Sequence, residues 1–150
     1  MQITSRFSIA IHAMGCIHYF GKDGSRVTSH LISSSTGVNP VIVRGVIAQL
    51  RDAGIIRTQQ GSGGAKIAKS LESITLYDIY KAVDSVDDRG LFRFHENPNP
   101  LCPVGRNIYN AVDDVFGDIE CALENRLKSV KLSQIIDDLE SKIICESKGD

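Results

Sequence analysis

Cysteine is scarce in this chain, and long apolar runs are absent. The 150 residues include four cysteines, Cys16, Cys102, Cys121 and Cys145, which are too scattered for a secreted disulfide scaffold, so we expect a reducing, cytoplasmic environment. No run of roughly eighteen apolar residues exists, which predicts that nothing spans a membrane. The apolar stretch 9–20 carries two histidines and no basic leader precedes it, so we interpret it as a core helix and not as a signal peptide.

The composition is that of an ordinary globular domain. Hydrophobic residues make up 42% of the chain and charged residues 23%, which excludes a disordered or fibrous protein. A single domain of this length buries roughly 70% of the surface of its unfolded chain, so it needs neither disulfides nor a metal in order to fold.

The net charge of −1 hides an uneven distribution. Residues 1–70 carry eight basic and two acidic side chains, a net charge of +6, whereas residues 71–150 carry nine basic and sixteen acidic ones, a net charge of −7. Such asymmetry favours a basic half that meets a polyanion and an acidic half that stays away from it. The alternative is that two oppositely charged lobes neutralise each other, so the pattern within the basic half must decide.

Turn residues and apolar spacing predict a mainly α fold with a small β-hairpin wing. The expected helices begin at Thr4 or Ser5 and end by Gly21, and then span 28–35, 39–54, 75–83, 104–130 and Ser133 to about 145, while the expected strands are 55–58 and 66–68. The order helix, short helix, glycine turn, helix and hairpin is that of a winged helix-turn-helix. Residues 87–103 form the least regular segment and hold three of the four prolines.

The second helix of the expected pair is the one that enters a DNA major groove in such folds. Its inward positions, spaced at i, i+3, i+4 and i+7, are Val43, Val46, Ile47 and Leu50. The opposite face presents Val41, Arg44, Gly45, Ala48 and Asp52, with Asn39 at the helix start. Arg44 can reach a guanine edge or a phosphate, and Val41 can touch a thymine methyl group. The alternative is that this face of small residues packs on another subunit.

The glycine-rich stretch 61–64 resembles a phosphate-binding loop only superficially. A P-loop requires a preceding strand and a following helix, whereas a second strand is expected here, so a hairpin wing is the simpler interpretation. Arg57, Gln59, Gln60, Ser62 and Lys66 are nearby donors for a sugar–phosphate backbone, whose contacts would fix register and not sequence.

Several stretches together resemble one known family, the Rrf2 family of bacterial winged helix-turn-helix transcription regulators. They are the opening Thr4-Ser5-Arg6-Phe7, Gly37-Val38-Asn39-Pro40, residues 50–56, Gly61-Ser62-Gly63-Gly64, and residues 74–79 followed by Ala82-Val83. The resemblance covers nearly the whole chain. It implies a homodimer joined by the long helix, a palindromic operator, usually a repressor, and a sensor that is an iron–sulfur cluster, a reactive thiol or a partner enzyme.

The candidate DNA-contacting residues lie at the helix starts, on the exposed face of the second helix and on the wing. They are Thr4, Ser5, Arg6, Thr28, Asn39, Pro40, Val41, Arg44, Arg57, Gln60, Ser62 and Lys66.

The long helix carries an apolar stripe that suits a helical dimer seam. The stripe repeats in steps of three and four residues through Ile108, Val112, Val115, Ile119 and Ala122. The alternative is that the helix packs wholly on its own domain. A lone long helix beside so small a winged module would leave apolar surface exposed, so dimerisation is favoured.

The cysteines do not have the spacing that the family's cluster needs. Cluster-bearing members place three closely spaced cysteines before the long helix, whereas this chain has only Cys102 there, so we expect no iron–sulfur cluster, no other cofactor and no metal site. A rearranged site across a dimer that uses His95 is the remaining alternative. Cys102 is a sensor candidate, because a helix N-terminus and Arg106 both stabilise a thiolate, although it could equally pack as a small apolar residue. We expect Cys16 and Cys121 to be buried or half-buried, and Cys145 to be at the surface.

These observations predict three segments: a winged helix-turn-helix DNA-binding domain in 1–84, an irregular sensor loop in 85–103 and dimerisation helices in 104–150. The predicted function is that of a sequence-specific transcription regulator of double-stranded DNA, a homodimeric repressor, with possible thiol switching and a possible protein or small-molecule effector. One alternative is a winged-helix module that docks on a metabolic enzyme. The other is a cysteine-dependent enzyme, for which no motif supplies a base or an oxyanion hole.

Overall fold

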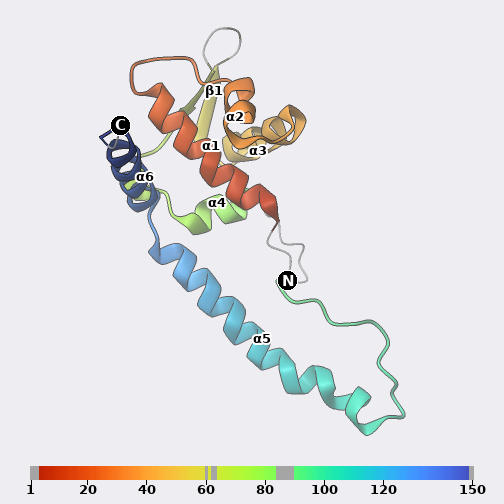
Figure 1. Cartoon of the computed structure of the whole chain (residues 1–150). Helices are drawn as coiled ribbons and strands as arrows, with labels where there is room; N and C mark the ends of the chain where they lie inside the picture. Colours follow the sequence, from red (N-terminus) through yellow and green to blue (C-terminus); the bar gives the residue numbers. More distant parts are fainter. Residues whose placement is uncertain (1–3, 60, 62–63, 84–89, 149–150) are drawn as a thin grey trace.

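The computed structural model describes residues 4–59, 61, 64–83 and 90–148, and within them the fold is mainly helical with one antiparallel hairpin (Figure 1). This confirms the expected fold class. The helices are α1 Ser5–Gly21, α2 Ser29–Thr36, α3 Pro40–Asp52, α4 Leu76–Val83, α5 Pro103–Ser129 and α6 Leu132–Ser147, with a 3-10 turn at Leu71–Ser73, and the strands are β1 Ile56–Gln59 and β2 Gly64–Ile67.

Side-chain caps and one glycine define the α2–α3 pair. Thr28 Oγ1 accepts a hydrogen bond from the backbone N–H of the third residue of α2 at 3.2 Å, and Asn39 Oδ1 accepts from the second residue of α3 at 2.9 Å. Pro40 occupies the first turn of α3, where its missing N–H costs nothing. Between the helices, Gly37 adopts φ 68° and donates to the carbonyl of Ser33 at 2.9 Å, which ends α2. The two helices meet at a bend of 118°, within the range of helix-turn-helix pairs.

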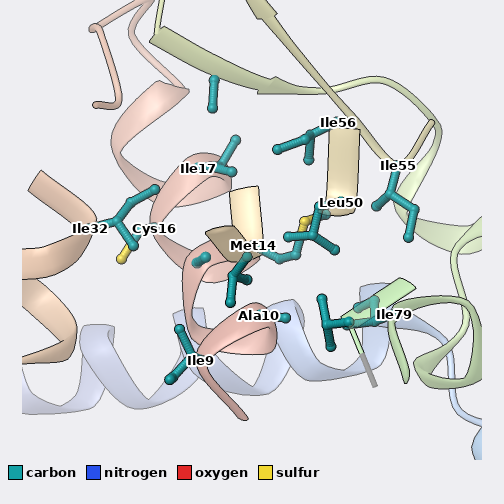
Figure 2. Close-up of a cluster of buried hydrophobic side chains, with 14 of the residues drawn as sticks. Ile9, Ala10, Met14, Cys16, Ile17, Ile32, Leu50, Ile55, Ile56 and Ile79 are labelled. Carbon is teal, nitrogen blue, oxygen red and sulfur yellow. The ribbon is translucent and has the colours of Figure 1, made fainter. Parts of the chain in front are cut away.

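The core is built around α1, which contacts α2, α3, α4, β2 and α6. Met14 of α1 is fully buried, and Ile32 of α2, Leu50 of α3 and Ile79 of α4 are equally inaccessible around it (Figure 2). Burial of each such side chain stabilises the fold by about 1.5–3 kcal/mol. We call α1–α4 and the hairpin, within residues 4–83, the winged unit; its apolar core is completed by Leu132 and Ile136 of α6.

The wing lies against the segment before α2. Its strands pair antiparallel from Ile56 opposite Ile67 to Gln59 opposite Gly64. Gly64 has φ +66°, and a Cβ at this position would lie 2.7 Å from the carbonyl oxygen of Val27. Glycine is required here because the backbone of β2 passes so close to that of Val27.

The long helix α5 extends away from the winged unit and contacts α4 near its own C-terminal end (Figure 1). There the Leu76 N–H donates to the Val130 carbonyl at 3.0 Å, and the Leu132 N–H donates to the Ile74 carbonyl at 2.8 Å. At 1.5 Å per residue, the 27 residues of α5 span about 40 Å. Among the residues that the structure describes in α5, only Leu127 is buried.

The irregular segment 90–102 packs along α5. The Leu91 N–H donates to Glu120 Oε1 at 3.0 Å. Phe92 stacks on Phe116 with ring centroids 4.5 Å apart, and Phe94 packs on Tyr109 at 4.7 Å. These contacts hold the segment on the helix without a helix or strand of its own.

Two sequence-based expectations are wrong. Ser133 does not cap the last helix: Lys131 is the N-cap of α6, its N–H donates to Gln134 Oε1 at 2.8 Å, and Ser133 lies inside the helix. The backbone hydrogen bond from the Leu132 N–H to the Ile74 carbonyl fixes the start of α6 at Leu132, before the start that Ser133 predicted. Cys121, expected to be at least half-buried, is exposed, whereas its neighbour Glu120 is on the side of α5 that the segment 90–102 covers.

No single helix within the described ranges is long and apolar enough to cross a membrane. The α2–α3 pair reaches that length and hydropathy only when its two helices are taken together across their bend.

Candidate DNA-binding surface

The outer face of α3 is free of packing, as its periodicity predicts. Val43, Val46 and Leu50 are fully buried, while Val41 on the opposite side is 68% exposed and Arg44 is exposed. A Cβ added at Gly45 would have no described atom within 4 Å. Because Gly45 has no side chain and no described neighbour here, a binding partner can approach the backbone of α3 closely at the middle of this face.

A groove of about 350 Å3 separates α3 from the wing. Three arginines line it, Arg26 before α2 and Arg44 and Arg51 on α3, together with Thr58 and Gln59 of β1. Among the described residues that line the groove, none is an aspartate or glutamate. Three guanidinium groups around one groove attract a polyanion, and the helix beside it fits the width of a DNA major groove.

Two of these arginines, Arg26 and Arg51, were not among the residues expected to contact DNA. Arg26 donates to the carbonyl oxygen of Gly61 at 2.5 Å, so it positions the tip of the wing. Arg51 pairs with Asp52 at 2.9 Å, which holds its guanidinium at the end of α3. The sequence signal was weak, because only the folded hairpin brings residue 26 to the wing.

The wing carries two cations opposite each other. Arg57 of β1 and Lys66 of β2 are paired in register and both are exposed. Like charges directly opposite in a hairpin are destabilising, and an anion between them relieves that repulsion. Gln60 and Ser62, which were expected to act here, lie outside the described residues.

The remaining expected residues lie at helix starts. Thr4, Ser5 and Arg6 are exposed at the beginning of α1, and Arg6 Nη1 donates to Gln49 Oε1 of α3 at 3.2 Å. The oxygens of Thr28 and Asn39 are engaged in capping, so their primary role in the structure is to orient the two helices.

Within the part of the chain that the structure describes, the thiolate ligands that an iron–sulfur cluster needs are far apart. Cys102, the half-buried N-cap of α5, lies nineteen positions before Cys121, or about 28 Å along the helix axis. Cys16 is buried in α1, and Cys145 is on α6. Across the described ranges, no three His, Cys, Asp or Glu side chains form a group that could hold a metal ion. The residues present do not fit an iron–sulfur cluster, whose ligands are closely grouped thiolates.

The apolar stripe of α5 is only partly covered within one chain. Val115 is 54% exposed and Ile119 is 47% exposed, whereas Ile108 and Val112 are half-buried. Ala122 is exposed. The stripe therefore continues as open apolar surface along the middle of the helix.

Comparison with known proteins identifies the family. Residues 3–138 match the Rrf2 family, described as iron-dependent transcriptional regulators. The chain belongs to the Rrf2 family. It is 38% identical over 138 residues to YwnA of Bacillus subtilis strain 168, an HTH-type transcriptional regulator by name, covering 92% of this chain and 99% of that protein.

Solved structures agree with this family's fold. A crystal structure of a protein described as DNA-binding is 33% identical, with a TM-score of 0.69 over 88% of this chain and 99% of the other. A transcriptional regulator from Lactobacillus plantarum, 20% identical, has the same fold, with a TM-score of 0.75 over 97% of this chain and 99% of the other. Rrf2 proteins are transcriptional regulators and not enzymes, so the alternative of a cysteine-dependent enzyme is excluded.

Proposed function

We propose that this Rrf2 protein is a sequence-specific transcription regulator that binds a palindromic DNA operator as a homodimer. The observation that carries the proposal is the groove between α3 and the wing, which is lined by Arg26, Arg44 and Arg51 and has no Asp or Glu among its described lining residues. In this arrangement α3 enters the major groove and the wing follows the adjacent sugar–phosphate backbone.

The contacts divide by role. Arg44, exposed at the centre of α3, and Val41 at its start read base edges. Arg57, Lys66 and Arg26 contact phosphates and fix the register of the protein on the duplex. The start of α1, at residues 4–6, supplies a further backbone contact.

The dimer is supported by the uncovered stripe on α5. Pairing two copies through Val115, Ile119 and Ala122 buries apolar surface that a single chain leaves open. Two winged units joined in this way address two half-sites separated by about one or two helical turns of DNA. A dimer that occupies a promoter excludes other proteins from it, so repression is the simplest regulatory outcome.

We propose that this member has no resident iron–sulfur cluster and that its input is oxidation of Cys102. The thiol is half-buried at the N-cap of α5, and Arg106 lies in the first turn, where its N–H donates to the Cys102 carbonyl at 3.0 Å. Because Cys102 is the residue from which α5 starts, its oxidation would act on the N-terminal end of the helix that carries the proposed seam.

Footprinting on the DNA upstream of the protein's own gene tests the binding mode. The expected pattern is two symmetric protected half-sites, one or two turns apart. A single unpaired site would contradict the dimer, and no protection at low salt would favour a protein-docking module instead.

Fluorescence anisotropy with reductant and with mild peroxide tests the switch. Binding should be lost on oxidation of the wild type and kept in Cys102→Ser. Binding that is indifferent to peroxide would discard Cys102 as the sensor and leave DNA recognition intact.

A further inference from the structure

A second cavity, remote from the DNA-binding groove, lies between α1 and α6. Its volume is about 420 Å3. Its lining includes Gly15, Cys16 and Ile136, which are all buried, and Leu139 and Ile143 of α6. The two helices are in close contact at Gly15, where an added Cβ would lie 3.2 Å from Leu139 Cδ2. The cavity therefore depends on how α6 sits on α1.

The lining of this cavity selects for a neutral molecule. Among the described residues that line it, none is an Asp, Glu, Lys or Arg. The aromatic side chains of Tyr19 and Phe20 also line it and are 39% and 41% exposed. An ionised ligand would lose its hydration here without gaining a partner of opposite charge.

One side of the rim is polar. His12 Nε2 and Ser35 Oγ form a hydrogen bond of 2.9 Å, and both side chains are exposed. Burial raises the pKa of the Cys16 thiol below them, and a side-chain hydrogen bond with Ser35 partly offsets that rise. Because Ser35 belongs to α2, this rim connects the cavity to the first helix of the helix-turn-helix pair.

We propose that this cavity binds a neutral, mostly apolar small molecule that carries one hydroxyl group. Its apolar body packs on Cys16, Ile136 and Leu139, and its hydroxyl hydrogen-bonds at the His12–Ser35 rim. A cavity of 150 Å3 holds benzene, so this larger, open one fits a body of about ten to fifteen non-hydrogen atoms. An apolar pocket with a few polar groups at one side is the usual form of a small-molecule site.

The regulatory consequence rests on the proposed function. A ligand that hydrogen-bonds Ser35 competes with the bond between α1 and α2, and so changes how the helix-turn-helix pair is held. The ligand is therefore an effector of DNA affinity.

The test is a calorimetric titration of the full chain with 1-naphthol, naphthalene and 1-naphthoate, in the absence of DNA. We expect 1-naphthol to bind, naphthalene to bind about two- to tenfold more weakly for want of the hydroxyl, and the charged naphthoate to bind most weakly. Since no DNA is present, failure of this titration would leave the proposed function standing, and failure of DNA binding would not alter its result.

Two matched variants locate the site. Ile143→Trp fills the cavity and should weaken 1-naphthol binding at least tenfold, whereas Ile144→Trp, on the neighbouring residue that is 53% exposed and outside the lining, should leave it unchanged. Ser35→Ala should remove the preference for naphthol over naphthalene without preventing naphthalene from binding. This last variant keeps the proposal testable if Ile143→Trp does not fold.

Three results would overturn the proposal. They are no binding of any of the three probes, equal binding to Ile143→Trp and wild type, and a naphthol preference that survives Ser35→Ala. Sedimentation of both tryptophan variants adds one more: dissociation of an oligomer by Ile143→Trp alone would make the cavity an interface between copies.

Discussion

The winged unit and the long helix α5 differ in how far each can bury its own apolar side chains. Met14, Ile32, Val43 and Leu50 of the winged unit are completely inaccessible within one chain. In α5, by contrast, Leu127 is the single buried residue among those described, and Ile119 is about half exposed. The comparison shows that the winged unit lies around a buried core to which α6 adds Leu132 and Ile136, whereas most of α5 keeps its apolar side chains partly exposed within one chain.

The largest effect is expected in the core of the winged unit. Leu50→Ala should lower the free energy of unfolding by about 2–5 kcal/mol, because it leaves a cavity beside α1. The matched change Ile119→Ala should cost far less within one chain, since the side chain is already 47% exposed. Chemical denaturation of both variants at low protein concentration measures the difference, and equal losses would remove the distinction between the two regions.

The second largest effect is expected from a charged residue in the α5 stripe, which should disrupt the proposed dimer and leave the winged unit folded. Ile119→Glu places a carboxylate in the proposed seam, so we expect monomers in sedimentation and at least about a tenfold loss of affinity for a two-half-site operator. The winged unit should keep its circular dichroism spectrum. A dimer that survives this change would show that α5 is not the seam.

Arg44→Ala should weaken specific DNA binding by about 1–3 kcal/mol and leave thermal stability unchanged, because the side chain is exposed. Arg126→Ala, which removes an exposed arginine from α5, is the control and should leave DNA affinity unaltered. If the two substitutions had equal effects on binding, α3 would lose its assignment as the recognition helix.

The smallest effect concerns the contact of α6 with α1. Hydrogen bonding from Lys22, aided by His18 at 2.9 Å, holds the pKa of Glu140 below its ordinary value of 4.5. A carboxyl group with a lowered pKa stabilises the fold above the unfolded value, and that contribution is lost as pH falls through the folded value. Thermal melting from neutral pH to below 4.5 should show a smaller decline in Glu140→Gln than in wild type. Identical declines in the two proteins would show that the Glu140 carboxylate does not contribute to the pH dependence of thermal stability.

The helix-turn-helix pair could be predicted almost completely from sequence, because its signals are local. Thr28, Gly37, Asn39 and Pro40 each act within a few residues of their own position, and the structure uses Thr28 and Asn39 as caps and Gly37 as the turn. Of the four α3 positions expected inside, helical spacing correctly gave Val43, Val46 and Leu50 as buried, whereas Ile47 is half-buried and lines the groove.

What the sequence did not reveal depends on contacts between distant residues. Arg26 reaches the wing tip at Gly61, and α6 packs on Gly15 across more than a hundred residues. The start of α6 was misplaced for the same reason, since a backbone bond to Ile74 sets it. No local sequence pattern predicts contacts between residues so far apart. The arginine-lined groove and the α1–α6 cavity were therefore found only in the structure.

The most direct test of the central claim is the salt dependence of DNA binding. Fluorescence anisotropy on the upstream fragment should show affinity falling linearly on logarithmic axes as salt rises. The slope should shrink by about one for each of Arg57→Ala and Lys66→Ala, because each removes one neutralised phosphate. Binding that is insensitive to salt, or a slope that neither substitution changes, would contradict the assignment of α3 and the wing as the DNA-binding surface.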